Sequence, residues 1–218
     1  MENRRLPLPE KRGYDRAYEL SYQFACEKLA QSDIEEQCHR SGAEYRITDS
    51  VREIIVQYLN QPYLITLSGI VISVINSPEP IALRDKLLIL HYFNTAKGTP
   101  PTDRLITFRE LPEGTVYFPT FSKRTIEPIL SNFSKEPRLL LRAGETLGGR
   151  KADYGNIGVT IPAFSKVPIT IILWQGDEEL PSQGNVLFDA NIPDYLPSED
   201  ITVLCETISW RLVRSLRE

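Results

Sequence analysis

The longest stretch of the sequence without a charged residue, residues 54–78, limits the fold more than any other feature. Asn60, Gln61 and Pro62 interrupt it, and the apolar remainder, residues 63–75, is shorter than the roughly 17 residues that a membrane-spanning helix needs. Its isoleucines and valines are β-branched, and such side chains pack well on a pleated sheet. The stretch therefore predicts strands and not a membrane span.

The same region predicts an antiparallel sheet. Residues 52–76 contain two strand-like runs joined by a tight turn at Asn60-Gln61-Pro62, and a third run follows over residues 70–75. No helical segment separates these runs. We therefore expect each strand to pair with its neighbour in the chain, which makes the pairs antiparallel.

Helices are predicted on both sides of these strands, because apolar residues recur there at helical spacing. They cover residues 14–31, a short segment from Ser32 to Gly42, residues 82–97, 118–133 and 138–147, and a C-terminal segment that Pro197 and Ser198 open. Further strands are expected over residues 104–111, 158–161 and 167–174. Runs of strands and of helices without regular alternation are typical of an α+β fold with a mixed or largely antiparallel sheet.

Composition places the chain among ordinary globular proteins. Of its 218 residues, 41% are hydrophobic and 25% are charged, which allows a sizeable core and excludes disordered and fibrous classes. No glycine- or serine-rich linker divides the sequence. We therefore expect a single α+β domain over residues 14–218, preceded by an N-terminal arm over residues 1–13.

Charge and cysteine content limit the possible partners and the compartment. The formal net charge of -4 argues against a nucleic-acid-binding protein, which needs a basic face for phosphate contacts. Arg4 and Arg5 near the start have no long apolar run behind them, so a signal peptide is not expected. Three cysteines are too few for a disulfide framework, which favours a reducing, cytoplasmic setting.

Histidines and cysteines give weak catalytic signals. His39 and His91 are the only histidines, so any histidine-dependent catalysis has to use one of them. His91 lies on an apolar helix face, which favours a hydrogen-bonded core histidine over a catalytic one. Cys26 and Cys205 also fall on apolar helix faces and are predicted to be buried, whereas the short helix around Cys38 leaves the burial of that thiol open.

An acidic region beside a tryptophan is the candidate site. There an apolar strand ends, a glycine turns the chain, and three consecutive carboxylates follow. The candidate ligand-binding residues are Trp174, Asp177, Glu178, Glu179 and Asp189, together with Arg109 and Glu110 from the predicted strand over residues 104–111. Carboxylates on adjacent loops can bind a hard cation, act as acid and base, or orient a ligand, while a solvated acidic turn is the alternative without function.

Two functions remain open from the residues alone. The first is a non-catalytic accessory protein that binds a small molecule or a partner protein, since no recognised catalytic constellation is present. The second is a metal-assisted hydrolase or transferase that uses the acidic cluster. The number of carboxylates favours the second function, and the lack of spaced histidines weakens it. The sequence specifies no cofactor, metal or oligomeric state.

Several motifs resemble those of a known family. They are Trp174-x-x-Asp177-Glu178-Glu179-x-Pro181, Leu187-Phe188-Asp189 and Tyr195-Leu196-Pro197-x-Glu199-Asp200, with the shorter pieces His91-Tyr92, Gly98-Thr99-Pro100, Phe108-Arg109-Glu110-Leu111-Pro112 and Gly148-Gly149. On these motifs the chain, from about residue 14 to its last helix, resembles a family of uncharacterised proteins of anaerobic bacteria and archaea. That family is known only as a domain of unknown function.

The resemblance implies a metabolic setting without naming a reaction. Some members of the family look like fusions with a cysteine-rich iron–sulfur segment of the kind seen in corrinoid iron–sulfur proteins. This sequence departs from them, because its N-terminus has no cysteine cluster, so no iron–sulfur cluster is expected. The setting that the resemblance implies is anaerobic cofactor or one-carbon metabolism.

Overall fold

Helices and one antiparallel sheet make up the computed structural model, which describes residues 11–217. The strands are β1 (Glu44–Thr48), β2 (Val51–Tyr58), β3 (Gln61–Thr66), β4 (Val71–Val74), β5 (Leu105–Thr107), β6 (Arg150–Ala152), β7 (Ile157–Phe164), β8 (Val167–Trp174) and β9 (Gln183–Asp189). The α-helices are α1 (Lys11–Ala30), α2 (Ile34–Ser41), α3 (Leu83–Thr95), α4 (Gly114–Phe121), α5 (Glu127–Phe133), α6 (Arg138–Thr146) and α7 (Ser198–Arg214). Short helices η1 (Phe108–Glu110), η3 (Ile192–Asp194) and η4 (Ser215–Arg217) are of the 3-10 type, and η2 (Ser122–Ile126) is a π-helix.

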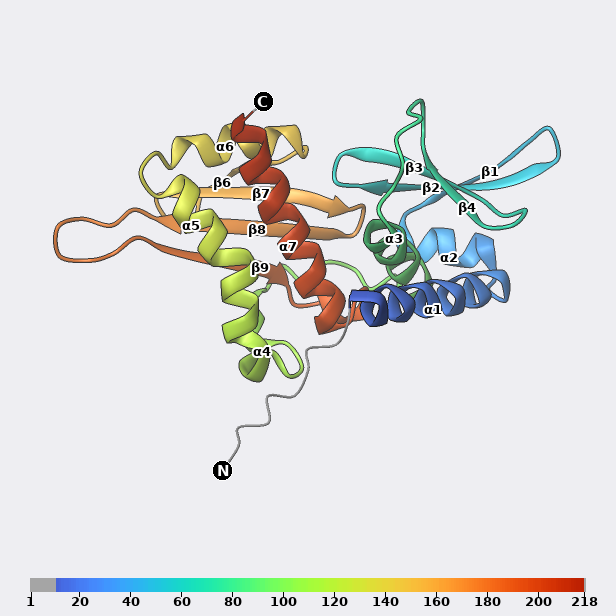
Figure 1. The fold of residues 1–218 in the computed structure, drawn as a ribbon, viewed down its shortest axis with the longest axis horizontal. Helices are drawn as coiled ribbons and strands as arrows, with labels where there is room; N and C mark the ends of the chain where they lie inside the picture. The colour runs from blue at the N-terminus through green and yellow to red at the C-terminus, as the bar shows by residue number, and fades with distance from the viewer. Residues whose placement is uncertain (1–10, 218) are drawn as a thin grey trace.

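Two halves of the sheet meet in the middle of the molecule. The strand order across the nine-stranded sheet of the described residues is β4-β3-β2-β7-β8-β9-β5, while β1 also pairs with β2 and β6 with β7. β2 and β7 join the halves where Tyr58 pairs with Phe164, and next to this couple the Leu59 N–H donates to the Ala163 carbonyl at 3.0 Å. Figure 1 shows β1–β4 on the right and β5–β9 on the left of this junction.

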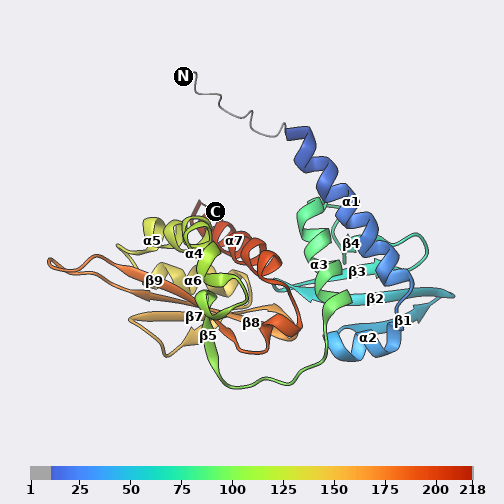
Figure 2. The same ribbon diagram turned by 90° about the horizontal axis from the view of Figure 1, so that it is seen from below.

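Helices of both halves lie on one common side of the sheet, whereas α2 lies on the other side of the N-terminal half (Figure 2). α1 and α3 cover the N-terminal half, and α4, α5 and α7 cover the C-terminal half (Figure 2). α3 and α7 therefore face each other above the junction. Among the described residues, no helix combines the length and the apolar character that crossing a membrane requires.

Aromatic rings fill the core at the junction. Phe164 stacks on Tyr92 with 4.0 Å between ring centroids and on Tyr58 with 4.9 Å, and Tyr195 lies 6.1 Å from Tyr92. All four rings are buried. Because aromatic pairs add to the apolar area that they bury, these contacts join the two halves into one hydrophobic core and one domain. The predicted α+β class with a largely antiparallel sheet is confirmed.

Where apolar residues recur with a strong helical or strand period, the structure contains the predicted helix or strand. The helix expected over residues 14–31 is α1, the one expected over residues 82–97 is α3, and the strand expected over residues 167–174 is β8 with those bounds. Of the N-terminal arm expected over residues 1–13, residues 1–10 lie outside the described residues, and residues 11–13 belong to α1. β1, β6 and β9 are additional to the predicted strands.

The β2–β3 turn and the start of α2 differ by one or two residues from their predicted positions, because of the conformations that residues adopt there. The hairpin turn is Leu59-Asn60, both with positive φ of 47° and 64°, and Gln61 and Pro62 already belong to β3. A two-residue turn with both φ positive matches the twist of paired strands, which explains the shift. The short helix expected from Ser32 begins instead after Asp33, whose side chain accepts a hydrogen bond from Glu36 N–H, and ends at Gly42 as predicted.

The strand predicted over residues 104–111 is wrong beyond Thr107. β5 ends there, and η1 follows with Arg109 and Glu110. The Glu110 carboxylate accepts hydrogen bonds from the Thr107 N–H at 2.7 Å and the Thr107 hydroxyl at 3.0 Å. This capping box turns the chain into a helical conformation at the point where the apolar pattern alone suggests that the strand continues.

Candidate functional site

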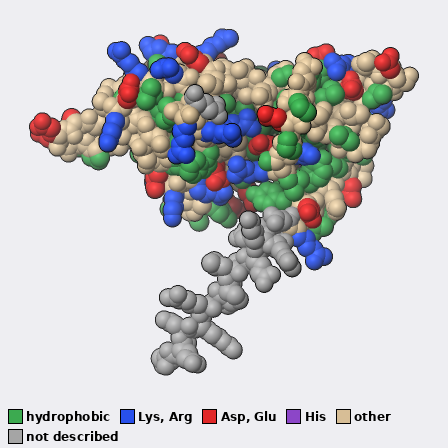
Figure 3. Space-filling view, turned by 45° about the horizontal axis from the view of Figure 1, so that its top comes forward, with side chains coloured by type: hydrophobic (Ala, Val, Ile, Leu, Met, Phe, Trp, Pro, Cys, Tyr) green, Lys and Arg blue, Asp and Glu red, His purple; other side chains and the backbone are tan. Residues whose placement is uncertain are grey.

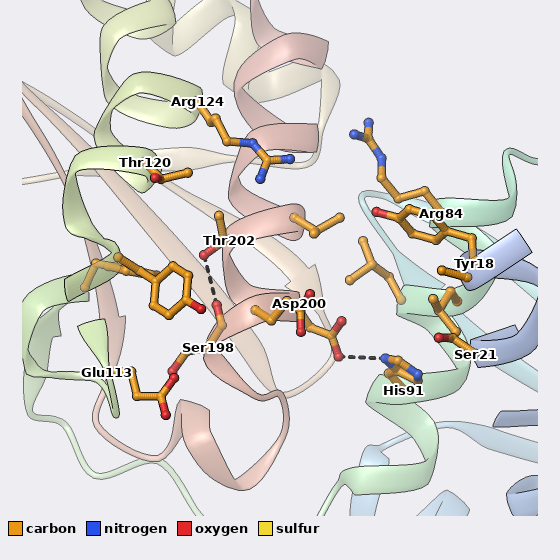
Figure 4. Close-up of a pocket in the computed structure, with 17 residues that line it drawn as sticks. Tyr18, Ser21, Arg84, His91, Glu113, Thr120, Arg124, Ser198, Asp200 and Thr202 are labelled. Atoms are coloured by element: carbon orange, nitrogen blue, oxygen red, sulfur yellow. Dashed lines mark hydrogen bonds and ion pairs between the residues drawn. The ribbon is translucent and has the colours of Figure 1, made fainter. Parts of the chain in front are cut away.

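A cavity of about 660 Å³ lies between the helices of the two halves. α1 and α3 form one wall, and α4, η2 and the first turns of α7 form the other (Figure 4). Its lining combines hydroxyl groups, such as those of Tyr18, Ser21 and Thr120, with apolar side chains, such as Leu88 and Val203. The cavity is therefore amphipathic, and neither half builds it alone.

His91 and Asp200 join the two walls. The Nδ1 atom of His91, on α3, lies 2.7 Å from Oδ2 of Asp200, in the first turn of α7. The two side chains are 31% and 12% exposed, and no other group within residues 11–217 bonds the Nε2 atom of His91. His91 is thus hydrogen-bonded as predicted, but it lies in a cavity wall and not in the core. An imidazole held in this way can serve as an ion-pair partner or transfer a proton through Nε2.

Arg84 and Arg124 approach each other from opposite walls. Arg84 belongs to α3 and Arg124 to η2, and both contact the same oxygen, Oε2 of Glu206 on α7, at 3.6 Å and 2.5 Å. Figure 4 shows their guanidinium groups directed toward the same end of the cavity. Two cations share one carboxylate here, so one positive charge is left over within this group of three. In the space-filling view, Lys and Arg side chains gather along α7 beside the hydrophobic side chains of the N-terminal half (Figure 3).

A partly buried polar contact closes the junction near the C-terminal end of α7. The Arg211 Nη2 atom lies 3.1 Å from Oδ2 of Asp85, and the Tyr58 hydroxyl donates to Oδ1 of the same carboxylate at 3.0 Å. Burial and the neighbouring Asp85 carboxylate raise the pKa of Tyr58 well above its usual range, so its phenol stays protonated and donates. Asp200, Glu206 and Arg211 on α7 thus each bridge to α3.

Ser198 is held as a structural group. Its hydroxyl donates to the Pro112 carbonyl at 2.8 Å, and the Thr202 hydroxyl donates to the Ser198 carbonyl at 2.9 Å. The first bond attaches the start of α7 to the turn before α4, and the second lies within the first turn of α7. A serine engaged in this way is not positioned by the histidine as a nucleophile–base pair would be.

The predicted acidic site lies in a different part of the molecule. Trp174 ends β8 with 41% of its surface exposed, and Asp177, Glu178 and Glu179 lie in the loop of the long β8–β9 hairpin at the left of Figure 1. The Asp177 carboxylate accepts hydrogen bonds from the N–H groups of Glu179 and Leu180, both at 2.9 Å. Because these bonds favour the charged form, they lower the pKa of Asp177. Asp177 therefore stabilises the turn.

Asp189 is at the other end of β9. A strand advances about 3.3 Å per residue, so Asp189 is about 20 Å along the strand from Gln183, where the hairpin loop ends. Its carboxylate is buried and accepts hydrogen bonds from the N–H and hydroxyl of Thr102 and from the N–H groups of Asp103 and Asn191. The structure does not bring it together with Asp177.

Arg109 and Glu110 also have local partners. The Arg109 guanidinium stacks over the Phe118 ring at 3.6 Å, and Glu110 completes the capping box with Thr107. Within residues 11–217, no group of three or more His, Cys, Asp or Glu side chains could hold a metal ion. The predicted site residues thus lie in three separate places: the β8–β9 hairpin, the end of β9 at Asp189, and the short helix η1.

The residues of the cavity carry little signal in the sequence. Arg84, Arg124 and Glu206 stand far apart in the chain, in separate helical segments. His91 and Asp200 do stand in the motifs His91-Tyr92 and Tyr195-Leu196-Pro197-x-Glu199-Asp200, and this co-occurrence is the one signal that could have drawn them together.

Comparison with known proteins gives a family assignment and no activity. Neither a curated protein nor a solved structure matches the chain. A family model described as "Domain of unknown function (DUF3786)" matches residues 33–211, which include both walls of the cavity except the part formed by α1. Since this match covers most of the 218 residues, the chain belongs to the family of the domain of unknown function DUF3786.

Proposed function

We propose that the protein binds a small molecule in the cavity between its two halves. The observation that carries this proposal is the cavity itself, with about 660 Å³ and walls from both α1–α3 and α4–α7. Small-molecule sites typically measure about 300–1,000 Å³ and combine apolar walls with a few convergent polar groups. This cavity matches both criteria.

Polar groups that converge on the cavity favour a binding site over a packing gap. Within residues 11–217 no group bonds the Nε2 atom of His91, and the Arg84 guanidinium lies 3.6 Å from its nearest carboxylate oxygen, beyond hydrogen-bond range. Such groups gain hydrogen bonds when a polar ligand enters.

The proposed setting is that of an accessory binding protein in anaerobic cofactor or one-carbon metabolism. Its support is the resemblance of the motifs around His91, Asp189 and Asp200 to proteins of anaerobes, some of which look like fusions with an iron–sulfur segment. Protein for ligand identification should accordingly be purified without air.

An enzymatic use of the same cavity is the second candidate, and the His91–Asp200 pair favours it. A carboxylate that orients an imidazole is a common arrangement for general acid–base catalysis. Metal-assisted hydrolysis or group transfer by the acidic hairpin has less support, because Asp189 is separated from Asp177 and bound as a loop anchor. Conversion of a retained molecule by the wild type and not by His91→Gln would favour the enzyme.

Native mass spectrometry of protein purified from its source cells tests the binding proposal. In Ser21→Trp the indole would fill space at the α1 wall, since Ser21 lines the cavity. Gln23→Trp is the matched control, because Gln23 lies exposed on the same helix and is not among the lining residues. We expect a retained mass on the wild type and on Gln23→Trp, and its loss from Ser21→Trp, with circular dichroism showing all three proteins folded.

Two outcomes of this experiment would contradict the binding proposal. Retention of the same mass by Ser21→Trp would place the ligand elsewhere. A wild-type protein that carries no added mass and binds nothing from a library of small polar metabolites would remove the proposal altogether.

A further inference from the structure

We infer that the ligand of this cavity is a small amino carboxylate, whose carboxylate binds at Arg84 and Arg124 and whose ammonium group binds toward Glu113 and Glu199. This inference rests on the proposed function and adds the chemical class of the ligand. It follows from how the charges are distributed over the cavity wall, beginning with the arginine end.

The arginine end has unused hydrogen-bond donors and a surplus positive charge. A guanidinium group carries five N–H donors, and within residues 11–217 Arg124 uses one of them on Glu206, while Arg84 donates none. The Arg84 and Arg124 side chains are 39% and 41% exposed, whereas the Glu206 side chain between them is 15% exposed. A single carboxylate entering here would neutralise the surplus charge and accept from both arginines.

The opposite end is acidic. Glu113 and Glu199 line the same cavity, and neither carboxylate has an ion pair or hydrogen bond with another described residue. Figure 4 shows Glu113 at the far end of the cavity from the two guanidinium groups. Asp200 adds a further carboxylate on this side, but it is engaged by His91 at 2.7 Å. A ligand with a second negative charge would be repelled there, and an ammonium group would be attracted.

The backbone around Glu113 fixes the acidic end in place. Glu113 has a positive φ of 60°, and the following Gly114 is packed so closely that a Cβ atom there would lie 1.9 Å from the Phe108 carbonyl oxygen. Non-glycine residues with positive φ are uncommon and are held by their surroundings. The turn therefore presents the Glu113 side chain from a defined backbone position.

Glu206 acts as an internal competitor of the ligand carboxylate. It occupies Arg124 at 2.5 Å from the same side of α7 that lines the cavity. Glu206→Gln keeps the shape of the side chain and removes its charge. Such a change should strengthen binding of an external carboxylate, whereas loss of a purely structural ion pair would not.

Isothermal titration with a matched set of probes tests the inference. The set is aminohexanoate with its shorter and longer homologues, hexanoate without the amine, hexylamine without the carboxylate, and neutral hexanamide. We expect the best-fitting amino carboxylate to bind at least tenfold more tightly than each of the other three compounds. Arg84→Gln should weaken binding of the amino carboxylate and of hexanoate about tenfold but leave hexylamine unchanged. Glu113→Gln should weaken binding of the amino carboxylate and of hexylamine but leave hexanoate unchanged.

Three controls keep the test decisive. Arg142→Gln removes an exposed arginine of α6 outside the cavity and should change no affinity. Glu206→Gln should raise the affinity for both carboxylates several-fold, and circular dichroism should show each variant folded. If Arg84→Gln does not fold, Arg124→Gln takes its place.

Two outcomes would overturn the inference. Equal binding of hexanamide and the amino carboxylates, blocked by Ser21→Trp, would leave a small-molecule site of another class and thus refute only the ligand class. Absence of binding by every probe at millimolar concentration would also refute it. Failure of the proposed function itself is recognised separately, by a retained mass that Ser21→Trp does not affect.

Discussion

Asp189 anchors the loop between α3 and β5. Its carboxylate accepts hydrogen bonds from Thr102, Asp103 and Asn191, with distances from 2.8 to 3.2 Å. Burial raises the pKa of this carboxyl group, but the hydrogen bonds from Asn191, Thr102 and Asp103 together outweigh burial, and the pKa lies below its usual range. Folding therefore stabilises the ionised form of the Asp189 carboxylate relative to the unfolded chain.

Replacement of Asp189 should make stability lose part of its pH dependence. A lowered folded pKa gives a stabilisation that is complete above the unfolded pKa of about 3.9 and disappears as the pH falls through the folded pKa. Asp189→Asn should lower the free energy of unfolding by about 1–3 kcal/mol at neutral pH and by less at about pH 3. Urea denaturation of both proteins, with the exposed Asp49→Asn as control, measures this. A difference that is constant with pH would contradict it.

The three thiols should differ in reactivity. Cys26 is half-buried, whereas Cys38 and Cys205 are 4% and 2% exposed. Burial raises the pKa of Cys38 to about 11 and raises that of Cys205 as well, and the thiolate is the reactive form. We expect iodoacetamide to modify Cys26 first, as read from the masses of its peptides. Equal labelling of Cys38 would contradict the burial of α2. Of the sequence-based predictions, burial of Cys205 is confirmed and full burial of Cys26 is wrong, while Cys38, whose burial the sequence leaves open, is buried.

At the scale of elements, α3 combines core and cavity residues. Leu90 is fully buried, whereas Leu87 is 7% exposed and lines the cavity. Leu90→Ala should lower the free energy of unfolding by about 2–5 kcal/mol. Leu87→Ala should cost less, because it enlarges a space that already exists. Chemical denaturation of both variants checks the order, and a loss well below about 1 kcal/mol for Leu90→Ala would place α3 at the surface.

Local sequence signals account for the elements but not for how they meet. Apolar periodicity predicts α1, α3 and β8 because it depends on neighbours within a few residues. Pro128 is expected to start or kink a helix over residues 118–133, and it does stand in the first turn of α5, where its missing N–H is tolerated. The π-helix η2 before it, which carries Arg124, has no local signature.

The residues of the cavity are harder to predict from the sequence than the helices and strands. Asp177, Glu178 and Glu179 attract notice because they are adjacent in sequence, yet Asp177 stabilises its own turn. Arg84, Arg124 and Glu206 come together only through the packing of α3, η2 and α7. Long-range contacts of this kind cannot be predicted from the spacing of single charges.

At the scale of the whole molecule, two kinds of side-chain contact reinforce the backbone pairing of β2 with β7 that joins the halves. Stacked aromatic rings around Phe164 join them at the sheet, and polar side chains of α3 and α7 bridge them above it. The space left between these helices is the cavity. A ligand that contacts both walls would add a further connection, so its binding should raise the melting temperature of the entire protein.

Amide NMR titration with a library of small polar metabolites tests most directly whether this cavity is the site. For compounds that bind, we expect chemical-shift changes concentrated at lining residues of both walls, such as Tyr18, Ser21 and His91 on one side and Thr120 and Thr202 on the other. Changes concentrated at Trp174 and residues 175–182 would contradict it, because they would place the site at the acidic hairpin.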